Sequence, residues 1–109
     1  MAYSQNLAER VRTATRTLGG VVEKKMFGGV VFLLRGNMLV GIMGSSLIVR
    51  LGPDAAVAAL KLDGVREFHV TGKPMKGWVV VEPDALESDR ALRGWIDRAA
   101  TFVETLPPK

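Results

Sequence analysis

The sequence contains no cysteine and only one histidine, His69. Without cysteine the chain cannot form a disulfide scaffold, a thiolate zinc site or a cysteine nucleophile. A single imidazole also excludes any site that needs two. The sequence shows neither a Walker A spacing nor a marked serine, histidine and aspartate arrangement. We therefore expect a domain that binds rather than an enzyme, with no catalytic residue, no cofactor and no metal site.

Long apolar runs and blocks of like charge are also missing. The longest uninterrupted apolar run, 29–34, is far too short to span a bilayer. The first residues lack the basic and apolar regions of a secretory signal. We therefore expect no membrane partner and a cytoplasmic location.

What is present is the composition of one ordinary globular domain. The chain has 109 residues, of which 48% are hydrophobic and 24% charged, so residues 1–109 are expected to form a single domain with a sizeable core. The 15 lysines and arginines exceed the 11 acidic residues, for a net charge of +4. That excess favours encounter with a polyanion only mildly.

Three segments carry helical signals. Ser4 is suited to cap the first helix, whose apolar stripe continues to Leu18 before two glycines end it. Gly52-Pro53-Asp54 opens the second, because proline fits a first helical turn, and Gly64 ends it. The third begins at Ser88 or Asp89 and ends before two prolines, at residues 88–106.

Short apolar segments between turn residues predict five strands, at residues 30–35, 38–43, 47–51, 66–70 and 78–82. Gly36-Asn37 supplies the positive φ angles of a tight hairpin. Gly28-Gly29 is expected to interrupt the strand region before it by a bulge or a bend. The segment 71–77, with two glycines and a proline, is predicted to be an irregular connection.

The predicted order is therefore α-β-β-β-α-β-β-α, which indicates an α+β domain. Hairpins dominate, so the sheet should be mainly antiparallel and five-stranded, with helices packed against it. The strands before residue 52 contain few polar residues to mark a wet face. Either both faces of the sheet are covered, or one face binds a partner.

Four motifs have the most distinctive composition: Lys24-Lys25-Met26-Phe27-Gly28-Gly29, Gly36-Asn37-Met38, 49–53 and 71–79. In this order and spacing they resemble the N-terminal domain of the TfoX/Sxy competence-regulator family, over nearly the whole chain. The resemblance implies a two-layer α/β sandwich with the element order given above. It also implies a role in regulation, because full-length members are positive regulators of DNA-uptake genes and are described as acting with the cyclic-AMP receptor protein. Those members carry a second, helical C-terminal domain, so with the sequence ending at Lys109 we expect no activity that depends on it.

Basic residues supply one group of candidate binding residues. Lys73 and Lys76 either contact an anion or phosphate from a glycine-flanked loop, or are simply solvated. Lys24 and Lys25 should point to opposite faces of a strand, where edge lysines also prevent aggregation. Arg50 either pairs with Asp54 or binds a ligand carboxylate or phosphate.

Apolar residues supply a second group. Met26 and Phe27 are candidates for partner contact, and Phe27 or Trp78 for base stacking. Met26, Met38, Met43 and Met75 either form an adaptable apolar patch or fill an irregular core. Trp78 and Trp95 are most simply core anchors, and His69 a surface residue that faces away from its neighbours in a strand.

These candidates support three hypotheses. The first is a non-enzymatic regulatory or adaptor domain that acts by protein–protein contact, as a homodimer or with a partner from the transcription machinery. The second is direct nucleic-acid binding through the basic residues Lys24, Lys25, Arg35, Lys73 and Lys76. The third is a sensor of a small anionic ligand, built around Arg50 and the glycine-rich loop.

Overall fold

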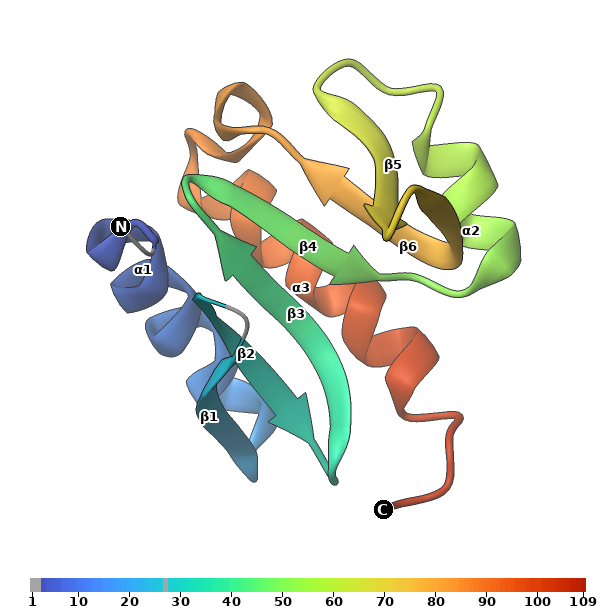
Figure 1. Cartoon of the computed structure of the whole chain (residues 1–109). Coiled ribbons are helices and arrows are strands. Elements are labelled where there is room, and N and C mark those ends of the chain that lie inside the picture. Colours follow the sequence, from blue (N-terminus) through green and yellow to red (C-terminus); the bar gives the residue numbers. More distant parts are fainter. Residues whose placement is uncertain (1–2, 27) are drawn as a thin grey trace.

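The computed structural model describes residues 3–26 and 28–109, and Figure 1 shows helices lying against a twisted sheet. In chain order the elements are α1 (Gln5–Thr15), the 3-10 turn η1 (Arg16–Leu18), β1 (Val21–Met26), β2 (Gly29–Leu34), β3 (Asn37–Met43), β4 (Ser46–Arg50), α2 (Pro53–Ala59), β5 (Val65–Val70), β6 (Lys73–Val81), the 3-10 turn η2 (Pro83–Leu86) and α3 (Asp89–Val103).

All strands belong to one antiparallel sheet in the order β1-β2-β3-β4-β6-β5. After β4 the chain passes through α2 to β5 at one edge, and β6 then returns between β5 and β4. The predicted α+β class and antiparallel pairing are confirmed. The predicted number of five strands is wrong, because β1 is a full strand paired along β2. The predicted interruption is present as a bend, since Gly28, with φ +77°, lies in the turn between these two strands.

The helices begin where their capping residues predict. The Ser4 hydroxyl accepts a hydrogen bond from the Leu7 N–H at 3.1 Å, and the Ser88 hydroxyl accepts one from the Ala91 N–H at 3.0 Å. Pro53 occupies the first turn of α2. None of these helices is long and apolar enough to cross a membrane, within the residues described.

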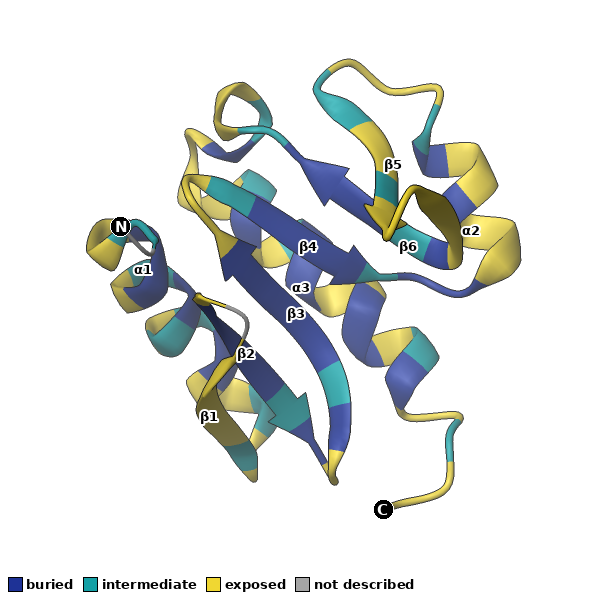
Figure 2. Ribbon diagram, in the orientation of Figure 1, coloured by how far each residue is buried: buried dark blue, intermediate teal, exposed yellow. Residues whose placement is uncertain are grey.

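All three helices bury their apolar stripes in one core on one face of the sheet. α1 contributes Leu7 and Val11, α2 contributes two alanines, and α3 contributes a stripe that includes Ile96. They meet alternate residues of the strands, such as Phe32 and Val49. Figure 2 shows the result: the central strands are largely buried, whereas β1 and β5 at the edges are mostly exposed or half-buried. The sequence left open whether both faces of the sheet are covered. In the described chain, helices cover one face, and no helix covers the other, which we call the open face.

The β2–β3 hairpin turns one residue earlier than predicted. Leu34 pairs with Asn37, so Arg35 and Gly36 form the two-residue turn, with φ +54° and +82°. Asn37 is instead a buried strand residue whose side-chain amide donates to the Pro107 carbonyl at 2.9 Å. The Lys109 N–H donates to the Arg35 carbonyl at 2.9 Å, so these two bonds fasten the C-terminal tail to the hairpin.

The prediction that residues 71–77 are irregular is wrong. Val70 pairs with Lys73, so Thr71 and Gly72 form a second two-residue turn with positive φ, and β6 continues from Lys73. Gly77, with φ +88°, lies in a bulge that shifts the β5–β6 register between Glu67 and His69. Tight turns and bulges let a glycine-rich segment remain a strand.

Thr71 provides a test of this turn. A β-branched residue at φ +50° is strained, whereas Asn adopts that conformation readily and Asn-Gly is the preferred pair for such a turn. We expect Thr71→Asn to raise the free energy of unfolding by about 1 kcal/mol, measured by urea denaturation. Thr101→Asn, at an exposed position of α3, is the matched control and should not stabilise the protein. An equal change in the free energy of unfolding for both variants would contradict the assignment of Thr71 to a turn with positive φ.

Candidate functional site

Two surface hollows are the main candidates for a site. One, of about 580 Å³, lies between α1 and α3 on the helical side. The other, of about 410 Å³, lies on the open face between β1 and the β5–β6 hairpin, and we call it the groove. The two hollows differ in their lining. Charged side chains, including an ion pair, line the first, whereas mostly apolar side chains line the second.

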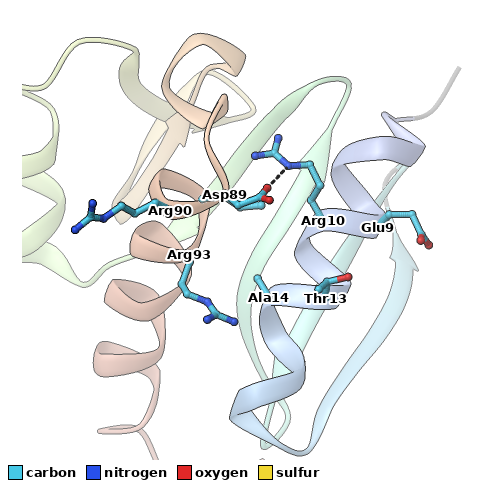
Figure 3. A pocket seen from close by; sticks show the side chains of 8 residues that line it. Glu9, Arg10, Thr13, Ala14, Asp89, Arg90 and Arg93 are labelled. Carbon is cyan, nitrogen blue, oxygen red and sulfur yellow. Dashed lines mark hydrogen bonds and ion pairs between the residues drawn. The ribbon is translucent and has the colours of Figure 1, made fainter.

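The hollow between α1 and α3 is lined by several charged side chains, of which Arg10 and Asp89 bind one another (Figure 3). The Arg10 Nε donates to the Asp89 carboxylate at 3.0 Å, and an Arg10 terminal nitrogen donates to the Leu86 carbonyl at 2.6 Å. Arg10 thereby ties α1 to the start of α3. We interpret this hollow as a helix junction rather than a binding site.

The groove is almost wholly apolar. By register, Val31, Gly41 and Ile48 on three adjacent strands lie side by side on the open face. Val31 and Ile48 are only 5% and 4% exposed, although no helix covers them in the described chain, because larger side chains surround them. Gly41 has no side chain, and a Cβ there would lie 2.7 Å from the Met38 Cε, so a larger residue would require the flexible end of Met38 to move.

The larger side chains include four methionines. Met26 from β1, Met38 and Met43 from β3, and Met75 from β6 all line the groove. Met26, Met43 and Met75 remain 41%, 49% and 39% exposed. The structure therefore brings together the methionines that the sequence singled out, and it places three of them at the surface rather than in the core.

Two aromatic residues, Phe68 and Trp78, line the opposite side of the groove. The Phe68 and Trp78 rings lie 6.1 Å apart at 48°, and the Arg50 guanidinium lies 5.1 Å from the Trp78 ring centre and 5.9 Å from that of Phe102. The expectation that Trp78 anchors the core is wrong, because the residue is half-buried on the open face. Trp95 is buried, as predicted.

The preferred pairing of Arg50 with Asp54 is also wrong. These two described residues form no ion pair within 4 Å. Arg50 pairs across the sheet with Trp78 on the open face, so its guanidinium stacks on aromatic rings instead. His69 is exposed, as predicted, and its ring contacts the Glu67 carboxylate at 3.0 Å, but the residue lines the groove together with Phe68 and Val70.

The predicted lysines are distributed over both faces. Lys24 pairs with Val31 on the open face, whereas Lys25 pairs with Val30, a core residue on the helical side. Lys73 and Lys76 belong to β6 rather than to a loop, and both are exposed. Phe27, the remaining candidate, lies outside the described residues.

Sequence reasoning missed one polar cluster beside the groove. The Glu82 carboxylate accepts hydrogen bonds from the Ser46 hydroxyl at 2.6 Å and from the Arg66 Nε at 2.7 Å. These two donors lower the pKa of Glu82. Residues 46, 66 and 82 meet only through the β4–β6–β5 order, which no local pattern in the sequence indicates.

A second carboxylate is held on the helical side. The Arg12 side chain donates two hydrogen bonds of 2.8 Å to Glu23 of β1, and also contacts Glu9. The hydrogen bond from Arg12 lowers the pKa of Glu23. Within the described residues, no three His, Asp or Glu side chains gather as metal ligands would.

Comparison with known proteins gives one finding. Residues 13–103 match the family model of the TfoX N-terminal domain. No curated protein and no solved structure matches the chain. The matched region includes every strand of the sheet and all of α2 and α3.

The bonds to Glu82 predict a pH dependence. Because the folded pKa lies below the unfolded value of about 4.3, the stabilisation is complete above that value and is lost as the pH falls through the folded pKa. Glu82→Gln should lower the free energy of unfolding by about 0.5 kcal/mol at pH 7, since this pair is partly exposed. The difference from the unchanged protein should shrink as the pH falls below 4, measured by urea denaturation across the range.

The matched control is Glu104→Gln, in the exposed turn after α3. A deficit in Glu82→Gln that stays constant down to pH 3 would contradict the electrostatic origin of the stabilisation.

Proposed function

Because this chain belongs to the TfoX N-terminal domain family, we propose that it is a non-enzymatic regulatory domain that acts by contact with another protein. The partner we propose is a component of the transcription machinery, which would also place the domain in the cytoplasm. The single observation that carries the proposal of protein contact is the groove on the open face.

The groove has the properties of a protein-binding surface. Contiguous exposed apolar patches are uncommon on monomers and mark interaction sites. Here Met26, Met43, Val70 and Met75 are all at least 39% exposed around one hollow. Methionines adapt to a partner's shape, and a half-buried tryptophan such as Trp78 is a frequent anchor of binding energy.

The same lining disfavours a small anionic ligand. Small-molecule sites place a few convergent polar groups among apolar ones. Among the described residues that line the groove, only His69 and Trp78 carry side-chain nitrogen or oxygen atoms, and the His69 ring contacts Glu67. Arg50, the centre of the anion-sensor hypothesis, is stacked on Trp78.

Direct binding of nucleic acid has weaker support as well. A nucleic-acid surface gathers basic residues on one face, where they contact successive phosphates. Lys24 and Lys25 lie on opposite faces of the sheet, and the surface between Lys24 and Lys73 is the apolar groove. We therefore retain protein contact as the proposed function.

Two methionines test the proposal. Met43→Glu combined with Met75→Glu places carboxylates on the groove at exposed positions, so the fold should survive while a bound protein is released. The control is Val57→Glu combined with Leu62→Glu, which makes the same chemical change at exposed apolar residues away from the groove. The measurement is affinity capture from native lysate with and without nuclease, with retained proteins quantified by mass spectrometry.

We expect a protein that the unchanged domain and the control retain after nuclease, and that the groove variant loses more than about tenfold. Circular dichroism and thermal unfolding should show both variants folded. Retention of the same proteins by the groove variant, or loss of every protein after nuclease treatment, would contradict the proposal.

A further inference from the structure

We propose that the groove binds an acidic protein segment, one with large apolar side chains flanked by aspartate or glutamate. This inference rests on the proposed function and names the chemistry of its partner. The reason is charge complementarity between such a segment and the two rims of the groove.

The first rim is β1, at the edge of the sheet. Lys24 pairs with Val31, which lines the groove, and it lies two residues from Met26, which also lines it. Because alternate residues of a strand share a face, Lys24 is on the open face beside Met26. It is exposed, so its ammonium group is available at this rim.

The opposite rim is the β5–β6 hairpin. Lys73 pairs with Val70, which lines the groove, and paired residues of antiparallel strands share a face. The two-residue turn at Thr71 and Gly72 fixes this register. Lys73 therefore lies on the open face at the far side of the groove from Lys24, and it too is exposed.

The carboxylates of the chain do not neutralise these rims. Within the described residues, neither Lys24 nor Lys73 has a carboxylate within 4 Å. The nearby acidic groups are engaged elsewhere: Glu23 is bound by Arg12 on the helical side, and Glu82 by Ser46 and Arg66. Glu67 pairs with the core residue Val79, and its carboxylate contacts the His69 ring. Of the residues that the structure describes, no aspartate or glutamate lines the groove.

An apolar floor between two positive rims selects among occupants. A second copy of this chain docked through the same face would bring four unneutralised lysines together, and like charges across an interface are unfavourable. A nucleic acid would cover apolar side chains with phosphates, which they cannot solvate. A segment with apolar residues in the middle would bury them against the apolar residues of the groove. Carboxylates at its ends would lie near Lys24 and Lys73, and this charge attraction would also speed its association.

The test uses a synthetic peptide of about ten residues, since at ~3.3 Å per residue an extended chain of that length spans the molecule. Three leucines alternate with serines in its centre, and two glutamates stand at each end. Matched peptides replace the glutamates by glutamine or by lysine, and a fourth replaces the leucines by serine. In a Trp95→Phe background Trp78 is the single tryptophan, so its emission reports binding in the groove itself.

The key variant is Lys24→Glu combined with Lys73→Glu. Its matched control, Lys25→Glu combined with Lys61→Glu, changes the net charge equally but leaves the rims intact, because Lys25 is on the helical side and Lys61 follows α2. We expect the acidic peptide to bind at least about tenfold more tightly than the lysine peptide and to change the emission of Trp78. The rim variant should reverse that preference, the control should keep it, and roughly 0.5 M salt should weaken it.

Other outcomes overturn the inference in distinguishable ways. Equal affinity for the glutamate, glutamine and lysine peptides, abolished by Met43→Glu with Met75→Glu, would refute the acidic preference while leaving protein contact in place. Binding of the leucine-free acidic peptide as tightly as the leucine peptide would refute the apolar anchors. Competition by a single-stranded oligonucleotide that the rim variant abolishes would favour nucleic acid and refute both proposals. Absence of binding by every peptide would refute the inference, and the capture experiment would then decide the proposed function alone.

Discussion

The apolar stripe of α3 lies across β3 and β4, the two central strands of the sheet, and contributes Leu92, Ile96 and Ala99 to the core there. α1 packs beside α3 and is tied to its first turn through Arg10, while α2 packs against β6. Because all three helices share this one core, they occupy one face of the sheet and leave the other to be closed by the strands' own side chains. The open face is thus a direct consequence of where α3 packs.

On the open face, large side chains of the strands cover the small apolar residues of the sheet, as the helices do on the other face. Val31 and Ile48 are buried among methionines and aromatic residues rather than beneath a second layer of helices. Burial of the small residues lowers the free energy of the isolated domain, but it leaves the covering residues partly in water. The same side chains therefore stabilise the sheet and remain available to a partner.

Local chemistry predicted most of the fold from the sequence. Ser4, Ser88 and Pro53 mark the helix starts correctly, because capping depends on a few neighbouring residues. The segment 71–77 was misjudged because Thr71 is an unusual residue at positive φ and because a bulge at Gly77 accommodates glycine within a strand. Arg35 also adopts a positive φ, so the turn of the β2–β3 hairpin lies one residue earlier than the sequence predicts.

The candidate site was predicted in composition but not in arrangement. The methionines and Lys24 were recognised as residue types suited to binding, and alternation correctly separated Lys24 from Lys25. Which face each strand presents depends on pairings between distant segments, such as β4 with β6. Trp78 and Arg50 were assigned wrongly for this reason, since their environment is created by α3 and by the β4–β6 pairing rather than by their neighbours in sequence.

The fastening of the C-terminal tail has a kinetic consequence. The bond from the Asn37 amide to the Pro107 carbonyl joins residues 70 positions apart, and closing so long a loop costs more chain entropy than forming a two-residue turn. We therefore expect the β2–β3 hairpin to form before this bond closes. In the reverse direction we expect the segment after α3 to detach before the strands separate, which would expose the Asn37 side chain to water.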